Sequence, residues 1–197
     1  MKVVLATHNP HKVAEFQQIV ASARPDLEII AYDGPEPVED GVTFAENALI
    51  KARAAAFATG ETAFADDSGI AAEALGGRPG VYSARFAGEH ATDRENLDKL
   101  LAEAPAGSRV AYVCAIAYVT ADGDEQVVEG RCEGTLTHDP RGTNGFGYDP
   151  LFFIPEMGKT TAELAPEQKH GISHRGKALR RMRELMNRLP SQPDAHA

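Results

Sequence analysis

The sequence predicts an α/β fold built around a mixed β-sheet with flanking helices. Strand-like residues 2–6 and 27–31 alternate with helix signals, which is typical of parallel strand–helix units. Residues 110–119 and 126–137 are also strand-like, and the turn at Asp122-Gly123 between them predicts a long antiparallel hairpin. Parallel units and a hairpin in one chain together indicate a mixed sheet.

Capping residues mark the expected helix starts. Asn9 with Pro10 is an N-cap followed by a favoured first-turn residue. A capping box at Thr43 opens an alanine-rich helix to about residue 59, and another at Thr92 opens a helix to about residue 103. Ser173 caps a last helix, whose apolar residues share one face.

The segment around two adjacent aspartates has two interpretations. Residues 62–65 are expected to form a short strand that ends at Asp66-Asp67-Ser68-Gly69. Either the carboxylates form a polar site at this strand end, or an aspartate caps a helical segment over residues 70–75. A further short strand is predicted at residues 151–154. Loops are predicted at residues 33–41, 76–80 and 139–148.

Length and composition indicate one globular domain over residues 1–190, with a disordered tail at residues 191–197. The chain has 197 residues, of which 43% are hydrophobic, and no apolar run reaches the about 18 residues of a membrane span. Its net charge of −9 disfavours nucleic acid and anionic membranes as partners, because both reward a basic surface. Cys114 and Cys132 lack metal-ligand spacing, so we expect core thiols in a cytoplasmic protein.

The first candidate site lies between the first strand and its helix, at residues 7–12. A helix N-terminus presents unpaired N–H groups and a partial positive charge, so it attracts phosphate. Lys12 is mildly unfavourable in the first helical turn unless a bound anion pairs with it. The alternative is a capped helix with an exposed lysine, since the glycines of a Walker loop are absent.

The second candidate site is the pair Asp66 and Asp67. Adjacent carboxylates repel each other unless a cation or hydrogen bonds hold them. Their hard oxygen atoms suit Mg²⁺, which binds through one or two carboxylates plus substrate phosphates. Glu39 and Asp40, in the first acidic loop, offer a further ligand, although such a loop is often merely solvated.

The third and fourth candidate sites lie near the end of the chain. In residues 145–150, glycines flank Phe146, so the backbone can approach a ligand closely while the ring stacks on a base. Residues 173–177, preceded by Lys169, offer several donors at a helix start, which suit a keto oxygen or a phosphate. The alternatives are a glycine-bearing turn with core aromatic residues and a basic solvated turn.

These motifs, in this order, resemble those of the inosine/xanthosine triphosphate pyrophosphatase family, from Lys2 to about Leu189. The matching segments are residues 5–12, 43–48, 65–69, 75–85, 145–150 and 173–179. The resemblance implies a two-lobed α/β fold around a long mixed sheet, with the active site in the cleft between the lobes. It also implies a Mg²⁺-dependent homodimer that hydrolyses ITP, dITP and XTP to the monophosphate and pyrophosphate.

The resemblance also implies roles for individual residues. Asp67 matches the proton acceptor, and Glu39 and Asp67 match the metal site. The triphosphate loop and the nucleoside pocket together give the expected substrate contacts: Thr7, His8, Asn9, Pro10, His11, Lys12, Ser68, Phe146, Gly147, Tyr148, Asp149, Lys169, His174 and Arg175. In this arrangement Lys12 and the metal would supply the local positive charge with which an acidic protein can bind a polyanion.

Other functions remain open at this point. One is a pyrophosphatase that acts on modified pyrimidine triphosphates. It differs from the first hypothesis only in the base of the substrate. Another is a nucleotide-binding module without turnover. The acidic pair beside an anion-binding loop disfavours the module, because a pure phosphate binder gains nothing from carboxylates without a metal.

Overall fold

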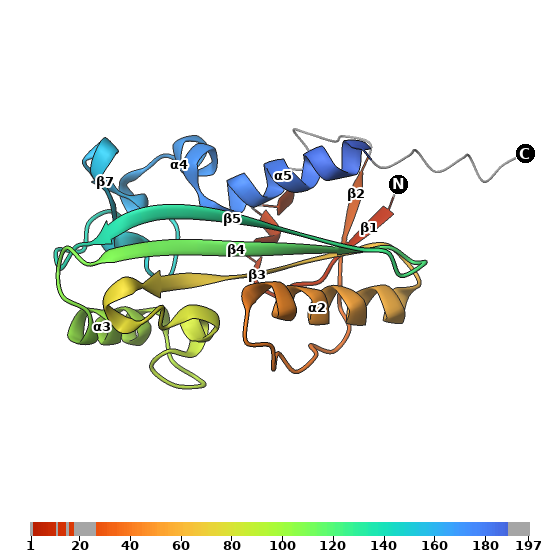
Figure 1. The fold of residues 1–197 in the computed structure, drawn as a ribbon, viewed down its shortest axis with the longest axis horizontal. Helices are drawn as coiled ribbons and strands as arrows, with labels where there is room; N and C mark the ends of the chain where they lie inside the picture. Colours follow the sequence, from red (N-terminus) through yellow and green to blue (C-terminus); the bar gives the residue numbers. More distant parts are fainter. Residues whose placement is uncertain (1, 11, 15, 18–26, 189–197) are drawn as a thin grey trace, which may run out of the picture.

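The chain forms one seven-stranded mixed sheet with the strand order β2-β1-β3-β4-β5-β6-β7 (Figure 1). The computed structural model describes residues 2–10, 12–14, 16–17 and 27–188. The strands are β1 (Lys2–Leu5), β2 (Glu28–Ala31), β3 (Ala63–Ala72), β4 (Arg109–Val119), β5 (Glu125–Leu136), β6 (Phe152–Ile154) and β7 (Lys159–Thr160). β1 pairs in parallel with β2 and β3, and the later pairs are antiparallel. The predicted α/β fold with a mixed sheet is therefore confirmed.

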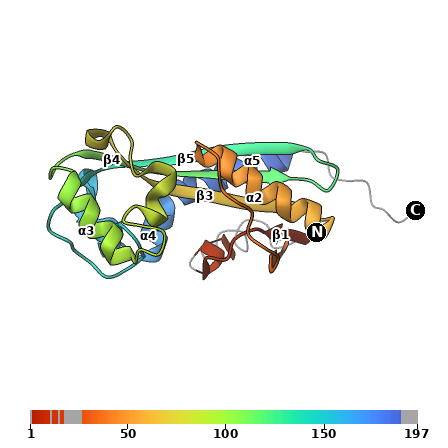
Figure 2. The ribbon, with the colours of Figure 1, turned by 90° about the horizontal axis from the view of Figure 1, so that it is seen from below.

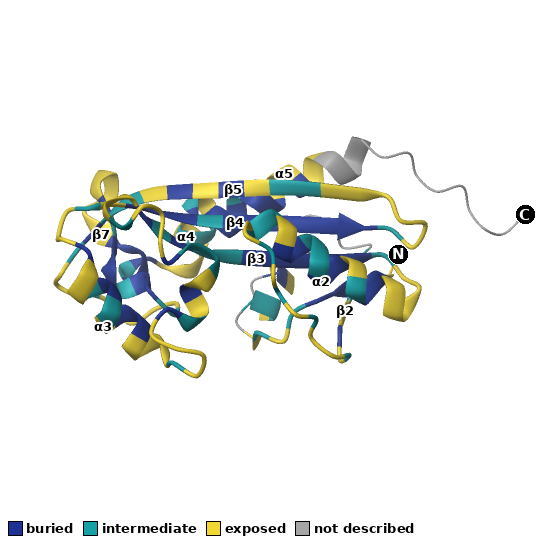
Figure 3. Cartoon of the chain, turned by 60° about the horizontal axis from the view of Figure 1, so that its bottom comes forward, coloured by how far each residue is buried: buried dark blue, intermediate teal, exposed yellow. Residues whose placement is uncertain are grey.

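Helices cover both faces of this sheet. The helices are α2 (Phe44–Thr59), α3 (Asp93–Glu103), α4 (Pro166–Ile172) and α5 (His174–Arg188), and residues 10, 12–14 and 16–17 are also helical. Alternate residues of β4 pack on opposite sides: Ala115 and Ala117 join the core under α2, whereas Cys114 and Ile116 join the core under α5. Figures 2 and 3 show α2 and α5 on opposite sides of the strands and β4 buried between its neighbours.

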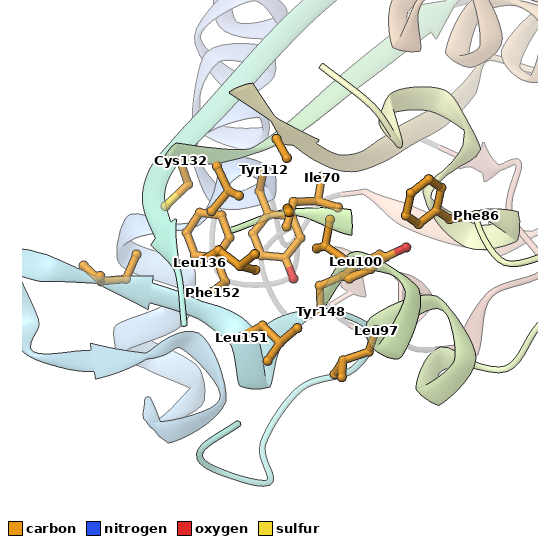
Figure 4. Packing of buried hydrophobic residues seen from close by; sticks show 14 residues of the cluster. Ile70, Phe86, Leu97, Leu100, Tyr112, Cys132, Leu136, Tyr148, Leu151 and Phe152 are labelled. Carbon is orange, nitrogen blue, oxygen red and sulfur yellow. The ribbon is translucent and has the colours of Figure 1, made fainter. Parts of the chain in front are cut away.

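A further apolar core lies at the opposite end of the long strands from β1 and β2. It packs residues of α3 against β3, β4 and the segment around β6 (Figure 4). Leu100 of α3, Ile70 of β3 and Phe152 of β6 are all fully buried there. Because β3 and β4 run from one core to the other, side chains at their middle lie between the two ends of the molecule. The division into two lobes stays a prediction.

The capping boxes define α2 and α3 as predicted. The hydroxyl of Thr43 accepts from the Glu46 backbone N–H at 3.2 Å, and Thr92 accepts from Glu95 at the same distance. Ser173 caps α5 by accepting from the backbone of Gly176 at 3.0 Å. Among the described helices, none is long and apolar enough to cross a membrane. The predicted tail at residues 191–197 lies outside the described residues.

The prediction for residues 62–75 was wrong in one respect. The strand does not end at Asp66 but continues to Ala72, and Glu73–Leu75 then forms a short 3-10 helix. β4 pairs with β3 along its whole length, from Ala63 to Ala72, and this long ladder outweighs the local turn preference of the Asp-Asp-Ser-Gly segment. No aspartate therefore caps a helix at residues 70–75. α4 and β7 were not predicted from the sequence.

Candidate active site

A cavity of about 310 Å³ lies beside the middle of β3. β1 pairs with β3 only at Val4–Ala63 and Leu5–Phe64, so beyond that point the strand leaves room at this edge. Elements from both ends of the sheet line the cavity: the loop after β1, α2, β3, residues 81–85, α3, residues 146–149, the middle of α4 and the start of α5. Its volume is in the range of small-molecule sites.

Asp66 pairs with two cations that line the cavity. Its Oδ2 lies 3.2 Å from Lys12 Nζ and 3.3 Å from Arg175 Nη2, and the aspartate is fully buried. Burial alone would raise the pKa of Asp66, but the charges of Lys12, Arg175 and Lys51 outweigh it and lower this pKa. Asp66 is therefore ionised at neutral pH. Nearby, burial and the charge of Asp66 raise the pKa of the Cys114 thiol to about 12, so this cysteine is an inert core thiol.

Replacing Asp66 with asparagine should destabilise the fold. The change keeps the shape but leaves Lys12 and Arg175 without their buried counter-charge, and breaking a buried ion pair from one side costs about 3–5 kcal/mol. Urea unfolding measures this loss. Asp67→Asn is the matched control, since Asp67 lines the cavity, and its midpoint should change much less. Equal midpoints for Asp66→Asn and the parent protein would contradict this account of Asp66.

Asp67 points to the other face of β3, because side chains alternate along a strand. Its Oδ1 lies 3.5 Å from Lys51 Nζ, and its Oδ2 accepts from Asn47 Nδ2 at 3.2 Å. Lys51 also lies 3.2 Å from Glu39 Oε1. Burial would lower the pKa of Lys51, but the charges of Asp67, Asp66 and Glu39 raise it above its ordinary value. The lysine thus stays a cation between two carboxylates.

The two aspartates therefore do not form one shared cation site. The sequence left open whether a cation or hydrogen bonds hold the adjacent carboxylates, and in the structure each aspartate has its own cation partners because side chains alternate along the strand. Asp66 is occupied by Lys12 and Arg175, whereas Asp67 lines the cavity together with Glu39. The Lys51 ammonium shows that the space between Glu39 and Asp67 suits a positive charge.

The donor set at this place fits Mg²⁺. In the part of the chain that the structure describes, no group of three His, Cys, Asp or Glu side chains forms a metal cage. Mg²⁺ does not need such a cage, since it is bound by one or two carboxylates with water and substrate phosphates. Glu39 and Asp67 supply oxygen ligands of this kind at the cavity wall.

Phe146 and Asp149 form a second wall of the cavity. Asp149 Oδ2 accepts from the Phe146 backbone N–H at 2.9 Å and from Lys169 Nζ at 2.7 Å. The Lys169 ammonium also lies 5.4 Å from the centre of the Phe146 ring. Asp149 thereby fixes both an aromatic surface and a cation. Tyr148 is different, because its hydroxyl donates to the Ser83 carbonyl at 2.8 Å and so ties this wall to residues 80–85.

The start of α5 places His174 and Arg175 at the same cavity. The helix approaches β5 closely at Gly130, where a Cβ would lie 2.0 Å from the His174 carbonyl oxygen. Only glycine therefore allows this packing. Arg175 Nη2 donates to Ser68 Oγ at 3.1 Å as well as pairing with Asp66, so the guanidinium is held in one orientation.

His174 is a buried, neutral imidazole. Its ring stacks on Tyr112 with the centroids 4.7 Å apart, and Tyr112 stacks on Phe152 at 4.4 Å. Burial lowers the pKa of His174 well below its usual value, and the charges of Arg175 and Lys169 lower it further. His174 Nδ1 is buried and has no hydrogen-bond partner among the described residues. A neutral imidazole offers one donor and one acceptor nitrogen.

The structure brings most of the predicted site residues into one cavity. These are Thr7, Asn9, Lys12, Glu39, Asp67, Ser68, Phe146, Gly147, Tyr148, Asp149, Lys169, His174 and Arg175. Asn9 starts the helix as predicted, since its Oδ1 accepts from the Lys12 backbone N–H at 3.4 Å. The individual roles of these residues stay predictions.

Two predicted substrate contacts do not line the cavity, and a third is not described. His8 is exposed, with its Nδ1 2.9 Å from Oε1 of the cavity residue Glu36 and its ring stacked on Tyr32. Pro10 is exposed at the helix start. His11 lies outside the described residues.

Several polar residues of the site were not predicted from the sequence. Lys51 on α2 and Asp93 and Asn96 on α3 line the cavity, and Asn47 supports it from behind. A signal was available for α2. Asn47 and Lys51 are one helical turn apart, and they interrupt a buried face that is otherwise alanine. Polar residues on an apolar helix face indicate a site.

The fold and the cavity define an α/β protein with a small-molecule site whose wall carries cations, among them Lys12 and Arg175, as well as carboxylates such as Glu39 and Asp67. The comparisons identify the family. The family model of the Ham1 family matches residues 3–185, and the chain belongs to this family.

Named relatives agree in sequence and in structure. A dITP/XTP pyrophosphatase of Leifsonia xyli subsp. xyli is 53% identical over 182 residues, which cover 90% of this chain and 92% of the relative. A HAM1 protein from Coxiella burnetii is 39% identical, with a TM-score of 0.87 and coverage of 96% of this chain and 100% of that one. A nucleoside-triphosphatase (dITP/XTP pyrophosphatase) from Mycobacterium abscessus is 42% identical, with a TM-score of 0.74 and coverage of 96% and 98%.

Proposed function

We propose that this protein hydrolyses non-standard purine nucleoside triphosphates, namely dITP, ITP and XTP, to the monophosphate and pyrophosphate. The named relatives support the substrate class. The observation that carries the proposal is the cavity itself. It joins Lys12 at a helix N-terminus, the carboxylates of Glu39 and Asp67, and the aromatic and donor groups at Phe146, His174 and Arg175.

The chemistry follows from this arrangement. Water attacks the α-phosphorus, a new P–O bond forms, and the bond to the oxygen that bridges the α- and β-phosphates breaks, so that pyrophosphate leaves. Asp67 orients the water and accepts its proton. Lys12 and the helix N-terminus hold the phosphates of the leaving group. Mg²⁺, held by Glu39 and Asp67, would neutralise the charge that repels the water and that builds up on the pyrophosphate.

Product analysis tests the reaction. With Mg²⁺ present, dITP should give dIMP and pyrophosphate in equal amounts, and removal of Mg²⁺ by a chelator should abolish turnover. Chromatography of the nucleotides and a pyrophosphate assay measure both products. Orthophosphate as the first product would exclude the proposed bond cleavage. Binding of dITP without turnover would favour a nucleotide-binding module, and preferential cleavage of a modified pyrimidine triphosphate would favour the pyrimidine alternative.

The family resemblance also supports proposals on assembly and location. We infer a homodimer in the cytoplasm, with a purine nucleoside triphosphate as the main partner. Size-exclusion chromatography with light scattering measures the oligomeric state directly.

A further inference from the structure

We propose that Asn47 is a positioning residue of this site. Its side-chain amide joins Asp67 to the acidic loop that carries Glu39, and so sets the two carboxylates at a fixed separation. This inference rests on the proposed function, because it assigns Asn47 a role in the same metal-dependent reaction. Asn47 does not line the cavity, so it acts through Asp67 and the loop and not by touching substrate.

Both ends of the Asn47 amide are used. Nδ2 donates to Asp67 Oδ2 at 3.2 Å, and Oδ1 accepts from the Gly41 backbone N–H at 2.9 Å. Gly41 follows Glu39 by two residues. Asn47 is only 1% exposed, so water does not compete for these bonds. A single rigid group therefore links the two candidate metal ligands.

The other contacts of Asp67 help Asn47 to fix the orientation of the carboxylate. Oδ1 accepts from the Ser68 backbone N–H at 3.0 Å and lies 3.5 Å from Lys51 Nζ. With Oδ2 bonded to Asn47, the carboxylate cannot rotate freely. Ligands of metals depend on such supporting hydrogen bonds, and loss of one typically costs about 10–100-fold in metal affinity or activity.

The amide is not needed to start the helix. Thr43 and Glu46 already form the capping box of α2, and Glu46 Oε2 also accepts from the Val42 backbone N–H at 2.7 Å. A helix that is capped independently can present Asn47 in its first turn and Lys51 in its second, on the same face. The buried polar side chain of Asn47 is thus explained by the site and not by the capping of α2.

The loop side offers a second way to disturb the same link. A Cβ added to Gly41 would lie 2.6 Å from Asn47 Oδ1, closer than real contacts allow, and also 2.7 Å from Glu46 Cβ and 3.0 Å from the Asn47 backbone nitrogen. Gly41→Ala should therefore displace the amide without removing any polar group. Glu46→Ala is the matched control: it weakens the start of the same helix but makes no contact with Asp67.

The experiment combines kinetics with direct metal binding. Mn²⁺ is titrated in the absence of nucleotide and followed by electron paramagnetic resonance, and kcat and KM are measured with dITP and Mg²⁺. For Asn47→Ala and Gly41→Ala we expect Mn²⁺ affinity and kcat to fall by about 10-fold or more, with KM for dITP changed less than about 3-fold. Glu46→Ala should lower the urea midpoint but keep both values near those of the parent protein.

The outcomes separate this inference from the proposed function. If folded Asn47→Ala keeps the Mn²⁺ affinity and kcat of the parent protein, the positioning role is overturned. It is also overturned if Glu46→Ala lowers Mn²⁺ affinity and kcat as much as Asn47→Ala does. If Asn47→Ala does not fold, the Mn²⁺ affinity and kcat of Gly41→Ala test the positioning role instead. If the parent protein does not hydrolyse dITP, the proposed function fails, but the Mn²⁺ titration still shows whether Asn47 sets the carboxylates.

Discussion

Replacing Asp67 with asparagine should lower kcat on dITP by about 10²-fold or more, because the variant loses both the proton acceptor and a metal ligand. Asparagine has nearly the same shape, so the change removes one charge from the cavity wall and little else. Lys51 would then lose one of its two carboxylate partners and keep Glu39. The fold should survive, since Asp67 lines a cavity and is not part of an apolar core.

Steady-state kinetics with dITP measures this effect, and circular dichroism checks the fold. Asp40→Asn is the matched control, because Asp40 is an exposed acid one residue after Glu39 and does not line the cavity. Its kcat should stay within about 2-fold of the parent value, as expected for an exposed residue outside the site. Near-normal turnover in Asp67→Asn would remove Asp67 from the catalytic role, and the water would then need another proton acceptor.

Local signals explain which elements the sequence could predict. The starts of α2 and α3 were correct to the residue, because Thr43 and Thr92 bind backbone groups only three residues away. The length of β3 could not be found in this way. It depends on pairing with β4, whose residues lie about 50 positions later in the chain, for example Asp66 opposite Ile116. A long-range ladder of this kind has no local signature.

For the candidate site, too, local patterns predicted the residues, whereas the contacts between distant segments could not be predicted. The motifs named residues such as Lys12, Phe146 and Arg175, which the fold brings to one cavity although they are far apart in sequence. They could not show that Asp66 and Asp67 serve opposite faces, since this follows only once the strand is known to continue. Nor could they show that Lys12 and Arg175 meet at Asp66. Contacts between distant segments are the part that sequence reasoning lacks.

Base selection should be the largest effect of all, with ITP, dITP and XTP hydrolysed about 10⁴-fold more efficiently than ATP. A 6-oxo purine presents an acceptor at position 6, whereas adenine presents an amino donor. Arg175 is a donor held in place by Asp66 and Ser68, and it cannot turn away when a second donor enters. Each unpaired buried polar group costs about 1–3 kcal/mol, so a few mismatches reach this discrimination.

GTP has the correct 6-oxo group, so its rejection must come from the 2-amino position, through a clash or an unpaired donor. ATP and GTP should therefore both be poor substrates, for different reasons. kcat/KM values for ITP, XTP, GTP and ATP, measured under the same Mg²⁺ concentration, test this order. Efficient hydrolysis of GTP would show that the pocket reads only position 6.

Arg175→Ala should lower kcat/KM for ITP far more than for ATP, and so narrow the preference between them. Because Arg175 also pairs with buried Asp66, the variant loses stability, and the comparison must be the ratio of the two substrates on the same folded sample. Arg180→Ala is the matched control: Arg180 lies on the same helix but donates to the Gly171 carbonyl at 2.9 Å, away from the cavity. It should leave the ITP-to-ATP ratio unchanged. Equal fractional losses on ITP and ATP in Arg175→Ala would instead show that the guanidinium serves the phosphates or the fold, and that another donor, such as neutral His174, reads the base.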